Sequence, residues 1–188
     1  MDRAEDRKEH CMIRAVLDTS VLVPRSTRSE LREQAAIGRF TAIWSPWIIA
    51  ELYRTLTWHW LVADAPRHQT TAGTTMALCD ASKPNRDRCA EMANRMMALL
   101  LVTPHWELVD PRPPYPPTWS QLKDPWDRPI WAAAVLGEAT YVVSENTHDY
   151  PPPNQDDRHI HADVEYLSTQ SFLDVLDSLD AEEQPTGS

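Results

Sequence analysis

Five oxygen-bearing side chains stand where the sequence predicts the ends of strands or the first turns of helices: Asp18, Glu51, Asp127, Asn146 and Asp149. Asp18 directly follows one short apolar run, and Asn146 and Asp149 follow another. Glu51 comes early in one expected helix, and Asp127 opens a second. Because strand ends and the following helix starts lie along one edge of a parallel sheet, we expect these oxygens to meet in one crevice.

The chemistry of such a crevice follows from charge. Carboxylates held close together repel one another, so they must take up protons or bind a cation. A set of oxygen ligands without an obligatory cysteine or histidine suits Mg²⁺ or Mn²⁺. Each residue alone also has an ordinary structural interpretation. Asp18 and Asp127 could cap helices, and Glu51 could be a carboxylate at the rim.

The elements that would position these residues are short apolar strands alternating with helices. The expected strands are 13–17, 40–44, 106–109, 141–143 and 164–167, and the expected helices are 30–37, 47–60, 84–101, 127–138 and 168–179. Ser45 and Pro46 provide an N-cap and a first helical residue, and Gly38 a helix end. This alternation predicts an α/β fold with a parallel sheet covered on both faces. Met92, Met96, Leu99 and Leu100 are expected inside.

Segments around these residues resemble the motifs of the PIN domain nucleases. The string VLDTSVLV around Asp18 is similar to their opening strand and turn, with Thr19 or Ser20 as the hydroxyl residue that follows the first aspartate. The string WSPWIIAEL is similar to the second motif, where Glu51 matches the glutamate of the family. The first two motifs thus lie in family order.

The last two motifs continue this order. DPWDRPI followed by AAA resembles the third motif, with Asp127 as the catalytic aspartate and Asp124 as an alternative or supporting residue. YVVSENTHDY resembles the fourth motif in its asparagine form, with Asn146 and then Asp149. The resemblance extends over about residues 13–179.

The resemblance implies a three-layer α/β/α sandwich with a mostly parallel sheet and a metal-dependent endoribonuclease with one or two Mg²⁺ or Mn²⁺ ions. It makes Asp18, Glu51 and Asp127 the ion ligands, with Asn146 and Asp149 completing the shell or orienting water. The supporting residues are Thr19, Ser20, Asp124 and Ser144. Many prokaryotic relatives are toxins of toxin–antitoxin pairs, so RNA, a cognate antitoxin and a homodimer are the implied partners. The alternative is a PIN-like domain that has become a non-catalytic binding or regulatory module, which the neutral Asn146 keeps open.

The charge distribution bears on RNA binding. The net charge is −10, but residues 1–144 are balanced and residues 145–188 carry all of the excess acid. The body of the domain can therefore meet phosphate. Arg25, Arg28 and Arg32 follow the Asp18 turn, and we expect them to steer the RNA backbone. The alternative is that they pair with Glu30 and Glu33 on an ordinary helix surface.

Several functions and sites are disfavoured by the sequence. Four scattered glycines form neither a Walker A nor a G-x-G-x-x-G loop, so we expect no nucleotide cofactor. Three cysteines without C-x-x-C spacing favour reduced thiols in a cytoplasmic protein, and we expect neither a signal peptide nor a membrane span. His159-x-His161 is a possible zinc pair, although a polar edge strand is favoured. We expect one domain over residues 12–180 between disordered tails, 1–11 and 181–188.

Overall fold

The computed structural model describes residues 13–63, 83–113 and 127–183, which fold around one sheet. The strands are β1 (Ile13–Leu17), β2 (Phe40–Trp44), β3 (Trp106–Leu108), β4 (Tyr141–Val143), β5 (Ile160–His161) and β6 (Val164–Leu167). The helices are α1 (Thr19–Leu22), α2 (Arg25–Ala36), α3 (Pro46–Ala63), α5 (Lys83–Leu101), α6 (Arg128–Leu136) and α7 (Thr169–Glu183), with a 3₁₀ turn at Thr147–Asp149. The strand order is β3-β2-β1-β4-β6-β5. Every neighbouring pair is parallel except β5 and β6.

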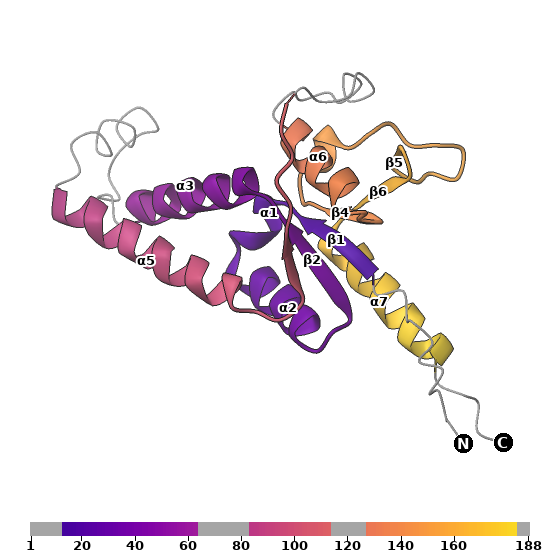
Figure 1. Ribbon diagram of the computed structural model, residues 1–188, viewed down its shortest axis with the longest axis horizontal. Helices are drawn as coiled ribbons and strands as arrows, with labels where there is room; N and C mark the ends of the chain where they lie inside the picture. The colour runs from indigo at the N-terminus through magenta and orange to yellow at the C-terminus, as the bar shows by residue number, and fades with distance from the viewer. Residues whose placement is uncertain (1–12, 64–82, 114–126, 184–188) are drawn as a thin grey trace, which may run out of the picture.

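Helices cover both faces of this sheet, as the alternation of strands and helices predicts. On one face Arg14 of β1 donates from Nε to the carbonyl of Gly137, directly after α6, at 2.6 Å. On the other face Phe40 of β2 meets Phe172 of α7 edge-on, with ring centroids 5.0 Å apart. Figure 1 shows α6 above the sheet and α2 and α7 below it. The expected three-layer α/β/α fold is therefore confirmed.

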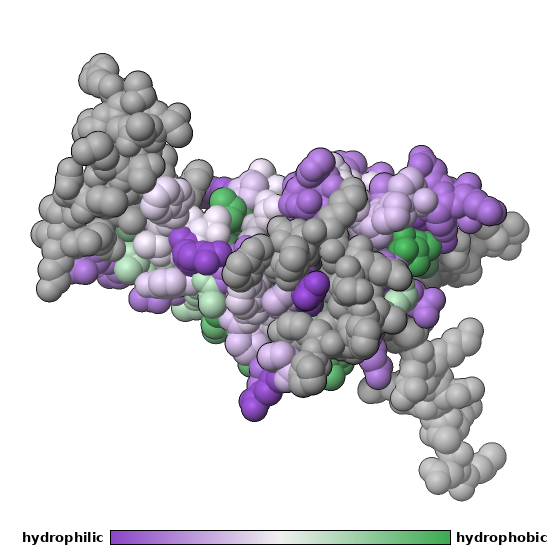
Figure 2. Space-filling view, turned by 90° about the horizontal axis from the view of Figure 1, so that it is seen from above, coloured by the Kyte–Doolittle hydropathy of each residue, from purple (hydrophilic) through white to green (hydrophobic). Residues whose placement is uncertain are grey.

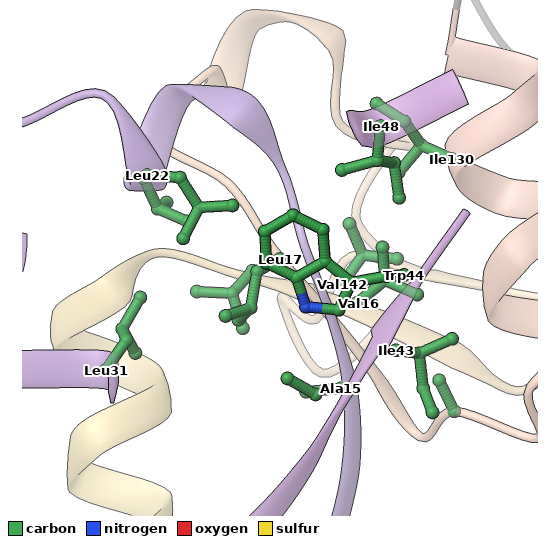
Figure 3. Packing of buried hydrophobic residues seen from close by; sticks show 14 of the residues in the cluster. Ala15, Val16, Leu17, Leu22, Leu31, Ile43, Trp44, Ile48, Ile130 and Val142 are labelled. Carbon is green, nitrogen blue, oxygen red and sulfur yellow. The ribbon is translucent and has the colours of Figure 1, made fainter. Parts of the chain in front are cut away.

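The core lies between the sheet and these helices. Trp44, at the end of β2, is 2% exposed and lies among apolar side chains from the sheet and its covering helices (Figure 3). Leu17 and Leu31, from β1 and α2, are equally buried. Burying a large apolar side chain contributes about 1.5–3 kcal/mol, so this cluster anchors the strand ends that carry the site.

Two glycines occupy positions that other residues fit poorly. Gly38 has a φ of 82°, in the left-handed region, and turns the chain from α2 into β2. A Cβ on Gly137 would lie 2.6 Å from Cγ2 of Ile43 and 2.9 Å from the carbonyl oxygen of Ala133. The missing side chain at Gly137 therefore lets the end of α6 close onto β2.

The start of α3 follows its sequence signal. Ser45 Oγ accepts the backbone N–H of Ile48 at 3.3 Å, and the helix begins at Pro46. The prediction for α2 is less accurate, because this helix begins at Arg25 rather than at the expected residue 30. The segment 62–82, whose structure the sequence leaves ambiguous, lies outside the described residues from position 64 onward.

The buried stripe of α5 differs from the expected one. Of the four residues expected inside, Leu100 is buried and Met96 is partly buried, whereas Met92 and Leu99 are 37% and 53% exposed. Cys89, Ala93 and Met97 are buried as well. The two stripes are neighbours on the helix, and the small side chains of Cys89 and Ala93 face inward as α5 packs along α3. Leu136, expected on the packed side of α6, is likewise 55% exposed.

The C-terminal part contains the polar edge strand that the sequence favours at the H-x-H string. β5 runs antiparallel to β6 and joins it through the two residues Ala162 and Asp163. α7 continues to Glu183, into the residues expected to begin a disordered tail. Among the described helices none is long and apolar enough to cross a membrane. The face in Figure 2 is mostly hydrophilic where it is coloured, with small separate hydrophobic patches.

Candidate active site

The Asp18 carboxylate sits at the carboxyl end of β1, where it is 8% exposed. Its Oδ1 accepts the backbone N–H of Thr19 at 2.6 Å and the hydroxyl of the same residue at 3.3 Å. Its Oδ2 accepts the hydroxyls of Ser20 at 2.7 Å and Ser144 at 2.8 Å. Residues that follow two adjacent strands, β1 and β4, thus fix the orientation of one carboxylate. The first of these bonds also makes Asp18 the N-cap of α1, the structural alternative that the sequence leaves open.

The chain after β4 forms the second wall of the site. Ser144 Oγ accepts the backbone N–H of Asn146 at 3.0 Å, in addition to its bond to Asp18. The side-chain amide of Asn146 donates to Oδ2 of Asp149, which the 3₁₀ turn brings back toward the strand end. The hydroxyl of Tyr150 donates to the Ser144 carbonyl. These bonds hold Asn146 and Asp149 as a linked pair beside Asp18.

A depression of about 410 Å³ brings together residues from β1, α3, α6 and the loop after β4. Its polar lining residues are Asp18, Thr19, Ser20, Glu51, Thr55, Asp127 and Asn146. Asp127 lies in this depression because it occupies the N-cap position of α6, although its side chain makes no capping hydrogen bond. Glu51 lies there because it belongs to the second turn of α3, next to the buried Leu52. Asp18, Glu51 and Asp127 therefore line one depression, as the sequence predicts.

A small cavity of about 20 Å³, here called the inner cavity, adjoins this depression and shares Asp18, Asp127, Ile130 and Asn146 with it. It is lined by Asp18, Asp127, Ile130, Val142, Ser144, Asn146, Asp149, Tyr150 and Tyr166. Asp149 lines this inner cavity and Glu51 the depression, so the five predicted residues do not all line one pocket. Asp124 lies outside the described residues.

Two buried tyrosines, Tyr150 and Tyr166, complete the inner cavity. Tyr150 ends the fourth motif string but has no expected role there, and no motif includes Tyr166. Burial raises the pKa of Tyr166, and the negative charges of Asp127 and Asp18 raise it further. Burial also raises the pKa of Tyr150, helped by Glu145 and Asp18. Both hydroxyls therefore remain protonated donors at neutral pH. The one available sequence signal is the alternation in residues 164–167, which places Val164 and Tyr166 on one face of β6.

The donor set around the depression is suited to a hard divalent cation. Carboxylate and amide oxygens predominate, which is the ligand chemistry of Mg²⁺ and Mn²⁺. Within the described residues, however, no group of three or more histidine, cysteine, aspartate or glutamate side chains is gathered tightly enough to hold a metal. The residues therefore fit a cation by ligand type and because they share one depression, although they do not form a tight cluster among the described residues.

A longer groove of about 760 Å³ adjoins the depression, with which it shares Val23 and Pro24. Arg25, Arg28 and Arg32 of α2 line it. Arg28 is 7% exposed, and its Nη1 donates to the carbonyls of Leu22 at 2.7 Å and Val23 at 2.8 Å. Its burial and the charge of Arg25 lower its pKa. Arg28 thus holds the turn between α1 and α2, a different position from the exposed steering residue that we expected.

The two histidines of the H-x-H string do not form a metal pair. His159 Nδ1 lies 2.7 Å from the carbonyl oxygen of Pro151. His161 packs edge-on against Trp131, with ring centroids 4.1 Å apart. The imidazoles contact different parts of the protein because β5 is a short edge strand, as the favoured interpretation predicts.

A comparison with protein families identifies the fold and agrees with the motifs. The family model described as PIN domain matches residues 14–148. The chain belongs to the PIN domain family. The matched residues of this PIN domain include Asp18, Glu51, Asp127 and Asn146, whereas Asp149 and Tyr166 lie beyond them. PIN domains are generally nucleases and typically use divalent metal ions. Neither the curated proteins nor the solved structures include a match to the chain.

Proposed function

We propose that this PIN domain is a metal-dependent endoribonuclease whose cation is Mg²⁺ or Mn²⁺. The observation that carries the proposal is the depression shared by Asp18, Glu51, Asp127 and Asn146 at the carboxyl edge of the parallel sheet. Carboxylates that converge from β1, α3 and α6 repel one another, and a divalent cation between them offsets that repulsion. Family membership supports the nuclease class, and the acidic set supports metal dependence.

The residues have separate roles in this proposal. Asp18, Glu51 and Asp127 hold the cation, while Asn146 and Asp149 complete the shell or orient water. When bound, a divalent ion activates a water and stabilises the leaving oxygen of an in-line displacement at phosphorus. Asp18 accepts four hydrogen bonds, and the contact from Thr19 Oγ1 to Oδ1 is the longest at 3.3 Å, so this is the weakest bond that a cation held by Asp18 would have to replace. Thr19, Ser20 and Ser144 keep this carboxylate oriented.

The adjoining groove supports a path for the RNA backbone. Arg25 and Arg32 lie on it and are exposed, and within the described part of the chain neither forms a salt bridge with Glu30 or Glu33. Their charges are therefore available to phosphate, whereas Arg28 supports the helix start. The groove meets the acidic depression at Val23 and Pro24, so a strand lying along it reaches the cation site.

The proposal is tested by cleavage of unstructured and structured RNA in Mg²⁺, in Mn²⁺ and in excess chelator. We expect cleavage that chelator abolishes, and a loss of about 100-fold or more in Asp127→Asn, which removes one charge from the depression. The matched control is Asp174→Asn, because Asp174 is an exposed carboxylate of α7 that contacts Gln170. Equal losses in both variants would contradict an active-site role for Asp127.

The second candidate is a non-catalytic RNA- or protein-binding module. It is favoured by the neutral Asn146 and by the lack of a tight group of three metal-binding side chains among the described residues. RNA binding without cleavage in either metal would support it. Whether the protein is the toxin of a toxin–antitoxin pair, with a cognate antitoxin and a homodimeric state, belongs to the same proposal, and co-expression with a neighbouring gene product tests it.

A further inference from the structure

The hydroxyl of Tyr166 is the least explained polar group at the site. Tyr166 is 6% exposed, and its Oη is fully buried without a hydrogen-bond partner among the described protein atoms. The hydroxyl of neighbouring Tyr150, in contrast, donates to the Ser144 carbonyl. Burying a hydroxyl without a hydrogen-bond partner is unfavourable, so native proteins usually supply a partner or a water.

The inner cavity provides the space for such a partner. Tyr166 lines this cavity of about 20 Å³ together with Asp127, Asn146 and Asp149. One water needs about 10–15 Å³ of such volume and two to four polar neighbours. The cavity thus has the size and the polarity for a single water, because a phenol and carboxylates are among its lining residues.

Asp127 is the carboxylate best suited to receive that water. Asp18 already accepts four hydrogen bonds, which use the lone-pair positions of a carboxylate. Asp127 lines both the inner cavity and the depression, so a water in the cavity lies beside a carboxylate that is proposed to hold the cation. The Tyr166 hydroxyl would donate to the water oxygen, and the water would donate one proton to Asp127.

We propose that Tyr166 is a positioning residue that holds one ordered water against the Asp127 carboxylate. This water fixes the orientation of the carboxylate that holds the cation. The inference rests on the proposed function, because it assumes that Asp127 binds a metal. Tyr166 comes from β6 and lies beyond the residues that match the family. Its register partner on β4, Val142, lines the same cavity, so the sheet itself fixes the position of the phenol.

The first test is a high-resolution crystal structure of the full chain. We expect one water within hydrogen-bond distance of both Tyr166 Oη and an Asp127 carboxylate oxygen. A cavity without water, or a phenol bonded directly to Asp127, would overturn the inference. This test needs neither metal nor RNA, so its result is independent of nuclease activity.

The second test measures Mn²⁺ affinity by titration calorimetry in Tyr166→Phe, which removes only the hydroxyl. We expect a Kd about 10-fold weaker, the effect typical of a lost partner behind a ligand, with the Tm within about 2 °C of the wild type. The matched control is Tyr141→Phe, which makes the same change on β4 where the ring meets Phe172 of α7. An unchanged Kd in Tyr166→Phe, or a fall in Tm alone, would contradict the positioning role.

Failure of the proposed function gives a different pattern. Wild-type protein that binds Mn²⁺ but never cleaves RNA would contradict the nuclease, while the affinity comparison still decides the role of Tyr166. Cleavage by the wild type with equal affinities in both proteins would contradict Tyr166 alone. Wild-type protein that binds no Mn²⁺ would overturn both.

Discussion

Asp18 combines a structural and a chemical role at the level of a single residue. Its Oδ1 caps α1, and its Oδ2 ties the chain after β4 to the end of β1. The same hydrogen bonds that stabilise these two segments also orient the carboxylate toward the depression. The structure thus separates two effects that are often confused in mutants, the loss of a cap and the loss of a charge.

Two substitutions of Asp18 distinguish these effects. Asp18→Asn loses the charge, keeps an acceptor for the Thr19 N–H, and puts an amide N–H in place of Oδ2, to which the Ser20 and Ser144 hydroxyls can act as acceptors instead of donors. We therefore expect a change in unfolding free energy below about 1 kcal/mol and loss of Mn²⁺ binding and cleavage. Asp18→Ala removes the cap and leaves the hydroxyls of Ser20 and Ser144 without their acceptor. We expect Asp18→Ala to lose Mn²⁺ binding and cleavage too, and in addition to lower the unfolding free energy by about 1–3 kcal/mol. Chemical denaturation and calorimetry measure both quantities.

The outcome that would contradict this separation is specific. If Asp18→Asn destabilises the fold as much as Asp18→Ala, the negative charge itself is structural. If Asp18→Asn retains full Mn²⁺ affinity, the carboxylate is not a ligand.

At the level of elements, the hairpin of β5 and β6 supports the strand that carries Tyr166. Ala162 and Asp163 form its two-residue turn with φ values of 41° and 67°. Positive φ at both central residues is the pattern of a type I′ turn, which prefers Asn-Gly. Ala162 and Asp163 adopt this backbone at a cost that Asn and Gly largely avoid.

The double variant Ala162→Asn with Asp163→Gly is therefore expected to stabilise the protein by about 1 kcal/mol. For a domain of this size that corresponds to a rise of about 2–4 °C in Tm. Asp163→Val is the opposing control, because a β-branched residue is strained at positive φ and should lower the Tm. A lower Tm in the double variant would show that another turn geometry is populated.

For the whole molecule, the important feature is the uneven distribution of charge. The net charge of −10 belongs to residues 145–188, and some of these acidic side chains form ion pairs with the rest of the domain. Arg39, which follows α2, forms ion pairs with Asp177 at 2.9 Å and Asp180 at 2.7 Å of α7. The arginine groove lies beside α2 on the neutral body of the domain, where an approaching phosphate meets positive charge.

Salt dependence of RNA binding tests whether this groove contacts the backbone. Each phosphate contact with a single strand contributes about 0.7 to the slope of log affinity against log salt concentration. We expect Arg25→Gln with Arg32→Gln to reduce the slope by about 1.4. The control is Arg54→Gln with Arg88→Gln, which removes two exposed charges outside the groove-lining residues. Equal slopes in the two double variants would exclude the groove as the RNA path.

The sequence alone determines much of this protein, because the strongest signals are local. Apolar runs of a few residues predict β1, β2 and β4 with correct bounds, and Ser45 with Pro46 predicts the start of α3. Because successive parallel strands end at one edge, their order also predicts that Asp18, Glu51 and Asp127 converge. These inferences require only periodicity, caps and the geometry of a parallel sheet.

Other features were decided only by the tertiary structure. The buried stripe of α5 depends on how closely small residues let it approach α3, which periodicity does not encode. Arg28 lines the groove but is buried, because its guanidinium donates to the carbonyls of Leu22 and Val23 at the end of α1. Tyr166 reaches the inner cavity because β6 pairs with β4, a contact between residues far apart in the chain. Long-range packing sets the stripe of α5 and the strand pairing that places Tyr166, and the alternation in residues 164–167 indicates only the buried face of β6. The Arg28 contacts are close in sequence, but they depend on the turn between α1 and α2, which the sequence did not predict.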